Sequence, residues 1–86
     1  MEAKVITQEI EKLEEKEVEL GERLAAKVRE FKENAAKYSI YEICEFLPGE
    51  LDRINETKRQ LDVVKEKLRM LVWMKKEVEE GVQGQG

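Results

Sequence analysis

The chain has 86 residues, of which 42% are charged and 6% are aromatic, and its 20 acidic and 16 basic side chains give a net charge of −4. This composition predicts one small helical domain and disfavours sheet-rich folds. The acidic balance disfavours bulk attraction to nucleic acid or to anionic membranes, and no apolar run approaches the ~18 residues that a membrane-spanning helix needs.

The single cysteine and the N-terminal residues indicate the cellular compartment of the protein. The single cysteine, Cys44, has no second cysteine for an internal disulfide, which favours a reducing compartment. The first residues lack the basic and then apolar layout of a signal peptide. We therefore expect a cytoplasmic protein. Abundant Glu, Lys and Val without His are also typical of thermophile proteins.

The pattern of residues 3–38 predicts the first long helix. This stretch contains no proline and one glycine, Gly21, and its apolar residues recur at spacings of three and four on one face. Glu17 is the one polar interruption of that face. We expect the helix to end near Tyr38, because the apolar residues that follow lie on a rotated face.

Residues 40–47 predict a short connecting helix. Ser39, followed three residues later by Glu42, forms a capping-box pattern at its start. Pro48 and Gly49 are predicted to end this helix and to open the next. The large side chains of this region are expected to cover the end of a hairpin, with a binding surface as the alternative. They are Tyr38, Ile40, Tyr41, Ile43, Phe46 and Leu47.

Residues 50–80 predict the last long helix. From Ile54 onward, mostly aliphatic residues alternate spacings of three and four, the heptad rhythm of a helix that packs along a partner helix. Lys75 is a polar residue at one of these seam positions. Gly81 is predicted to end the helix, so that residues 81–86 form a flexible tail and residues 1–80 a single domain.

Two long helices joined by a short one should fold back on each other. The predicted fold is therefore all-α: an antiparallel, coiled-coil-like hairpin of two long helices with a short connecting helix. In this register the glutamates between residues 9 and 22 lie opposite the basic residues between 58 and 76, which favours the antiparallel arrangement. The predicted hairpin core consists of Ile10, Leu13, Leu20, Leu24, Phe31, Ile54, Leu61, Val64, Leu68 and Leu71.

The last helix also carries apolar residues away from its seam. Residues 70–74 read Met-Leu-Val-Trp-Met and are apolar nearly all round, a composition favoured at interfaces. We predict that Val63, Met70, Trp73 and Met74 form an interface. The simplest closed assembly is a homodimer whose two hairpins form a four-helix bundle. Coverage of these residues by other parts of the chain, or by a different protein, is the alternative.

Few catalytic groups are available. The chain has no histidine, which removes Cys-His and Ser-His nucleophile pairs, and Cys44 alone cannot form a zinc site. No glycine-rich phosphate loop occurs. We therefore expect no cofactor, no metal and no enzymatic activity. The predicted function is that of a non-catalytic helical assembly or protein-protein interaction module.

Two other functions remain open as alternatives. The basic residues between 58 and 76 could track phosphates in a small nucleic-acid-associated regulator. The order of a long, a short and a long helix, with Arg23, Lys27 and Arg29 on the first, resembles the all-helical chorismate mutases. That resemblance implies a small dimeric enzyme whose basic side chains grip two carboxylates. The spacing of the three residues departs from the family pattern, and their neighbours are mostly acidic.

Overall fold

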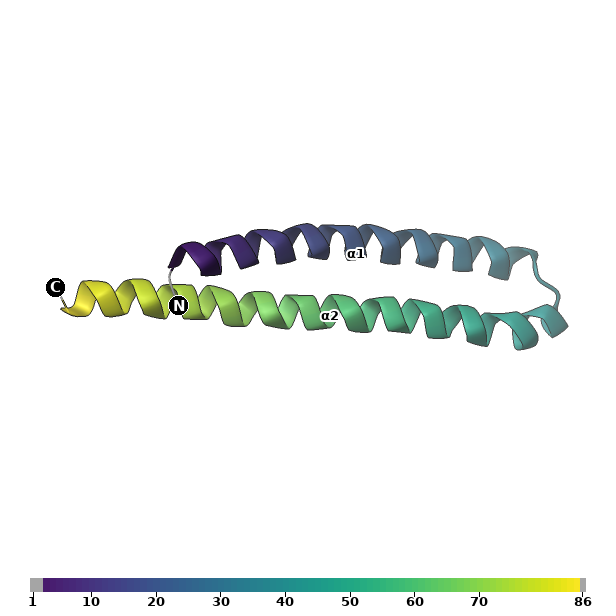
Figure 1. Cartoon of the computed structure of the whole chain (residues 1–86). Coiled ribbons are helices and arrows are strands. Elements are labelled where there is room, and N and C mark those ends of the chain that lie inside the picture. Colours follow the sequence, from purple (N-terminus) through teal and green to yellow (C-terminus); the bar gives the residue numbers. More distant parts are fainter. Residues whose placement is uncertain (1–2, 86) are drawn as a thin grey trace.

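The described part of the chain is a long helical hairpin. The computed structural model describes the backbone of residues 3–85 and the side chains of residues 3–81. Helix α1 (Ala3–Lys37) and helix α2 (Ile40–Gln85) run antiparallel along one another (Figure 1). The hairpin measures 68 × 16 × 14 Å. Its radius of gyration is 19.5 Å, against about 12 Å for a compact domain of this length. The predicted all-helical hairpin is confirmed.

A tight turn joins the two helices. The backbone N–H of Tyr38 donates to the carbonyl of Asn34 at 3.0 Å and closes the last turn of α1. The backbone N–H of Glu42 donates to the Ser39 hydroxyl at 3.3 Å, and the backbone N–H of Ser39 donates to the Glu42 carboxylate at 3.2 Å. These two reciprocal bonds confirm the predicted capping box, which satisfies amide donors that have no partner inside the helix.

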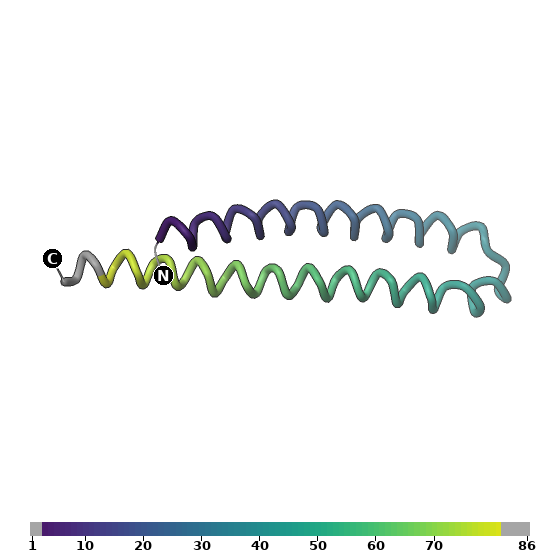
Figure 2. The backbone as a smooth tube through the Cα atoms, in the orientation of Figure 1, coloured from purple at the N-terminus to yellow at the C-terminus, as the bar shows by residue number. Residues whose placement is uncertain are grey.

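Helix α2 continues through Pro48 and Gly49, so the predicted separate helix at 40–47 is wrong (Figure 2). Proline inside a helix removes one backbone hydrogen bond and costs about 3 kcal/mol. Packing of the two residues before Pro48 offsets that cost. Leu47 is buried, and the Phe46 ring lies 5.8 Å from the ring of Tyr38. The predicted start of a new helix at residue 50 is wrong for the same reason.

The end of α2 also differs from the expectation. Gly81 does not end the helix, which runs to Gln85. Helical geometry at a glycine costs only about 1 kcal/mol relative to alanine, so one such residue does not stop a long helix. The predicted tail at 81–86 is therefore helical up to Gln85, and Gly86 lies outside the described residues.

The core is a narrow seam between the two helices. Leu20, Leu61 and Val64 are buried together in the middle of the hairpin. Leu13, Leu24 and Leu68 pack against them. Ile6 near the open end is fully buried, and Leu47 is buried near the closed end. Two helices can bury only one stripe each, so the rest of each helix stays exposed to solvent.

Candidate interface on α2

A row of exposed apolar side chains lies beside the seam of α2. Val63, Met70 and Trp73 are 49%, 58% and 62% exposed, and Met74 is half-buried. Large apolar side chains so close together and so exposed are typical of contact surfaces. We call these four residues the α2 apolar row.

The position of the row follows from helix geometry. Val63 and Met70 each come one residue before a buried or half-buried seam residue, Val64 and Leu71. One residue turns an α-helix by about 100°, so the row faces sideways and away from α1. This arrangement explains why α1 leaves the row uncovered. The alternative prediction, that the connecting segment or the N-terminal residues cover it, does not fit the exposure of Trp73.

The predicted hairpin core divides into two groups. Leu20, Leu61 and Val64 are buried, whereas the other members are half-buried at the edges of the seam. The half-buried members are Ile10, Leu13, Leu24, Phe31, Ile54, Leu68 and Leu71. The polar seam residues Glu17 and Lys75 are half-buried as well.

Three residues that are buried were not part of the predicted hairpin core. Ile6 is 0% and Thr57 is 4% exposed, and Leu47 is buried beside the turn. Ile6 and Thr57 continue the seam spacing of their helices, so the pattern could have identified both. Leu47 was expected among the side chains that cover the end of the hairpin, and it is buried there.

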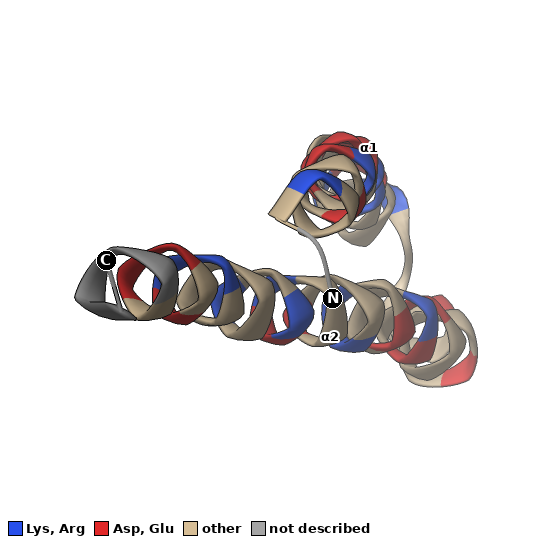
Figure 3. Ribbon diagram, turned by 60° about the vertical axis from the view of Figure 1, so that its left-hand side comes forward, with Lys and Arg blue, Asp and Glu red and all other residues tan. Residues whose placement is uncertain are grey.

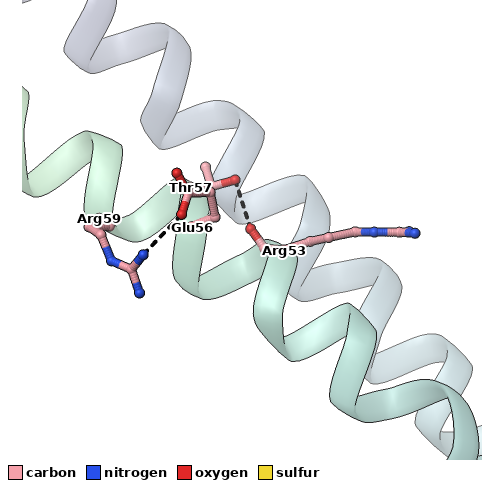
Figure 4. Close-up of polar contacts among 4 residues, drawn as sticks. All are labelled: Arg53, Glu56, Thr57 and Arg59. Carbon is pink, nitrogen blue, oxygen red and sulfur yellow. Dashed lines mark hydrogen bonds and ion pairs between the residues drawn. The ribbon is translucent and has the colours of Figure 1, made fainter.

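The charged residues of the described chain form ion pairs within each helix and not between the helices. Figure 3 shows acidic and basic positions alternating along and around α2. Among residues 3–81, the five ion pairs all join residues of the same helix. One of them joins Arg59 and Glu56 at 3.1 Å (Figure 4). The predicted charge complementarity across the hairpin therefore does not take the form of direct ion pairs, because the charged side chains are exposed on outer faces.

The one buried polar side chain of the seam is satisfied inside its own helix. The Thr57 hydroxyl donates to the carbonyl of Arg53 at 3.0 Å (Figure 4). A buried hydroxyl without such a bond would cost about 1–3 kcal/mol. Thr57 therefore fits the seam as a small side chain and provides no free group for chemistry.

The closed end of the hairpin holds a polar cluster that the sequence did not indicate. Glu50 Oε1 accepts hydrogen bonds from Asn34 Nδ2 at 3.1 Å and from the Tyr38 hydroxyl at 3.4 Å. Glu50 Oε2 is buried and has no hydrogen-bond partner among the described residues. A shallow pocket of about 160 Å³ lies beside this carboxylate. It is lined by Lys27, Glu30, Phe31, Asn34, Glu50, Arg53 and Ile54.

The basic residues of the chorismate-mutase comparison are not brought together in that pocket. Lys27 lines it, whereas Arg23 pairs with Glu19 at 2.9 Å and Arg29 is exposed. The pocket also presents two carboxylates to any anion. The arrangement therefore gives no support to a site that grips two carboxylates.

The surroundings of the polar cluster change the acidity of the Tyr38 hydroxyl. Burial raises the pKa of Tyr38 above its ordinary value of 10.0, and the charge of Glu50, the hydrogen bond to Glu50 and the charge of Glu42 raise it further. The unfolded chain loses this proton first, so folding stability falls as the pH rises from about 10 through the folded pKa.

We predict that tyrosinate absorbance in a Tyr41→Phe variant, where Tyr38 is the only tyrosine, titrates with a midpoint above about 10 in the folded protein. Adding Glu50→Gln should lower that midpoint only in part, because burial is the larger cause. The same variant unfolded in denaturant is the control. A folded midpoint equal to the unfolded one would contradict the prediction.

The remaining sequence features give no further site in the described residues. Cys44 is free and exposed. Residues 3–81 contain no cluster of acidic or cysteine side chains arranged to hold a metal ion. Over the part of the chain that the structure describes, neither helix has an apolar stretch long enough to cross a bilayer.

Comparison with known proteins gives no relative from which a function could be inferred: no family model, curated protein or solved structure matches the chain.

Proposed function

We propose that this chain is a non-catalytic helical assembly module that self-associates through the α2 apolar row. The observation that carries the proposal is the 62% exposure of Trp73 beside the exposed Met70. Tryptophan and methionine are enriched at protein interfaces, where their large side chains leave water. A homodimer of two hairpins, assembled as a four-helix bundle, is the simplest closed form.

The small core supports the proposal energetically. Fully burying a large apolar side chain contributes about 1.5–3 kcal/mol. The buried apolar side chains of the hairpin are Ile6, Leu20, Leu47, Leu61 and Val64. A second hairpin that covers the α2 apolar row would add burial comparable to a large part of this core. Self-association would therefore stabilise the fold as well as define the assembly.

The test is the solution mass, measured by light scattering after size exclusion over about a hundredfold range of concentration, because association follows mass action. One chain weighs 10.1 kDa, and we expect the mass of two chains. Trp73→Glu should shift the mass to that of one chain, since a charge cannot be buried unpaired in the interface.

Tyr41→Glu is the matched control. It also replaces an exposed aromatic residue of α2, with 81% exposure, but lies at the closed end of the hairpin. We expect this variant to keep the mass of two chains. A wild-type protein that stays monomeric at every concentration, or a Trp73→Glu variant that keeps the wild-type mass, would overturn the proposed function.

A further inference from the structure

The part of α2 that precedes Pro48 consists of residues 40–47, and most of its side chains are exposed. Ile40 and Tyr41, for example, are 73% and 81% exposed. Within residues 40–47, Leu47 alone is buried. A segment with so little buried apolar surface has a low local stability, because few contacts oppose its opening.

Pro48 and Gly49 separate this segment from the rest of α2. Pro48 has no backbone N–H, so the carbonyl of Cys44, four residues earlier, lacks its helical donor. Glycine in the middle of a helix adds a further cost, because it loses more conformational freedom than other residues. A groove of about 290 Å³ lies at the same place and is lined from both sides of Pro48, by Phe46 before it and Glu50 after it. Helix α2 is therefore weakest at this point.

A second set of helix-start signals lies directly at the break. Proline suits the first position of a helix, where its missing N–H costs nothing. In a helix that begins at Pro48, Glu50 falls within the first turn, where a carboxylate interacts favourably with the helix dipole. A form of α2 that begins at Pro48 would therefore avoid the cost that the proline has inside the continuous helix.

The hydrogen bonds of Glu50 hold the hairpin together on the other side of the break. Among the described side chains, the bond from Asn34 Nδ2 to Glu50 Oε1, at 3.1 Å, is the one that joins α1 to α2. Because Glu50 follows Pro48, this bond does not require residues 40–47 to be helical. The two long helices can therefore stay paired when the segment before Pro48 opens.

We propose that Pro48 is a hinge at which residues 40–47 leave α2 as one unit while the rest of the hairpin stays paired. In the open form, α2 begins at Pro48, and the turn becomes a longer loop that exposes Leu47. The hinge gives the closed end of the hairpin two forms. This inference concerns the single chain and does not depend on the proposed self-association.

Amide hydrogen exchange, followed for each residue by NMR, tests the hinge. In the open form the amides of residues 44–47, Gly49 and Glu50 lose their helical acceptors, whereas the amide of Leu51 keeps the carbonyl of Leu47. We expect these six amides to show similar protection, at least about tenfold below that of Leu51. Simple fraying from the start of α2 would instead give a gradual rise without a step after Glu50.

Two variants separate the hinge from a change in overall stability. Pro48→Ala restores the missing donor and should raise the protection of amides 44–47 by about 100-fold, because proline is far less favourable than alanine inside a helix. Gly21→Ala is the control, since Gly21 lies in α1 and a Cβ atom there meets nothing within 4 Å. It should raise the protection of Leu61 in the seam and leave amides 44–47 unchanged.

Three results would contradict the hinge. Amides 44–47 could be as protected as Leu61 in the unmodified protein, which would mean that they exchange only when the whole hairpin unfolds. Protection could rise gradually through Pro48 with no step, which would mean that the end of α2 frays without a hinge. Amides 44–47 of Pro48→Ala could exchange at the unmodified rate, which would mean that the proline does not control the opening.

Discussion

Replacing Leu20 with alanine should lower the free energy of unfolding by about 3 kcal/mol, in the range found for buried leucines. Leu20 is 1% exposed and lies between Leu61 and Val64 at the centre of the seam. The truncation removes the apolar contacts of Leu20 with this cluster and leaves a gap between the two helices. For a chain of this length, total stability is about 4–13 kcal/mol, so this single change removes a large part of it.

The measurement is urea unfolding followed by helical circular dichroism, at one fixed protein concentration because association contributes to stability. Val18→Ala is the matched control, since Val18 lies on the same helix and is 59% exposed. Its effect should stay below about 1 kcal/mol. If Leu20→Ala and Val18→Ala unfold at the same urea concentration, the central seam does not carry the stability assigned to it.

Replacing both Gly21 and Gly49 with alanine should raise the free energy of unfolding by about 2 kcal/mol, because each glycine inside a helix costs roughly 1 kcal/mol relative to alanine. Both residues are helical with no positive φ, and a Cβ atom built at either position meets nothing within 4 Å. The added methyl groups therefore cause no clash, and the gain comes from a less flexible unfolded chain.

The thermal midpoint of the double variant should rise by roughly 10 °C, since 1 kcal/mol corresponds to about 4–8 °C in a domain of this size. Ala26→Gly provides the reverse control, because Ala26 is an exposed residue within α1. It should lower the midpoint by several degrees. An unchanged or lower midpoint for the alanine variant would mean that Gly21 or Gly49 is needed for a contact outside the single chain.

The sequence predicted the helices and their direction because these features depend on short-range patterns. The start of α2 was set by two hydrogen bonds between Ser39 and Glu42, residues three apart, and a capping box of this kind can be read directly. The central seam could also be predicted, because the spacing of Leu61, Val64 and Leu68 leaves one stripe of α2 able to pack on α1.

The sequence could not predict what happens at Pro48, because the outcome depends on contacts between distant residues. Proline followed by glycine is a local signal for the end of a helix, and this signal is correct for most sequences. The burial of Leu47 and the hydrogen bond from Asn34 to Glu50 favour a helix that continues through that signal. The polar cluster at Glu50 was missed for the same reason, since its partners lie 12 and 16 residues away on the other side of the turn.

The α2 apolar row was predicted as an interface from its composition, and the structure gives its exposure. A sequence shows that Met70 and Trp73 lie off the seam, but it does not show whether another part of the chain covers them. That answer needs the position of α1, which follows the seam and leaves the side of α2 open. The solution mass of Trp73→Glu tests whether a second copy covers that side of α2.

The hairpin also has a mechanical consequence. Ala3 and the last turns of α2 lie at the same open end of the molecule, while the tight turn closes the other end (Figure 1). A force that pulls the two ends apart would load one layer of the seam at a time, beginning with the layer around Ile6. The molecule should therefore unzip gradually under a small force when pulled from its ends. It should resist a much larger force directed along the helix axes, because all layers of the seam would then have to slide together.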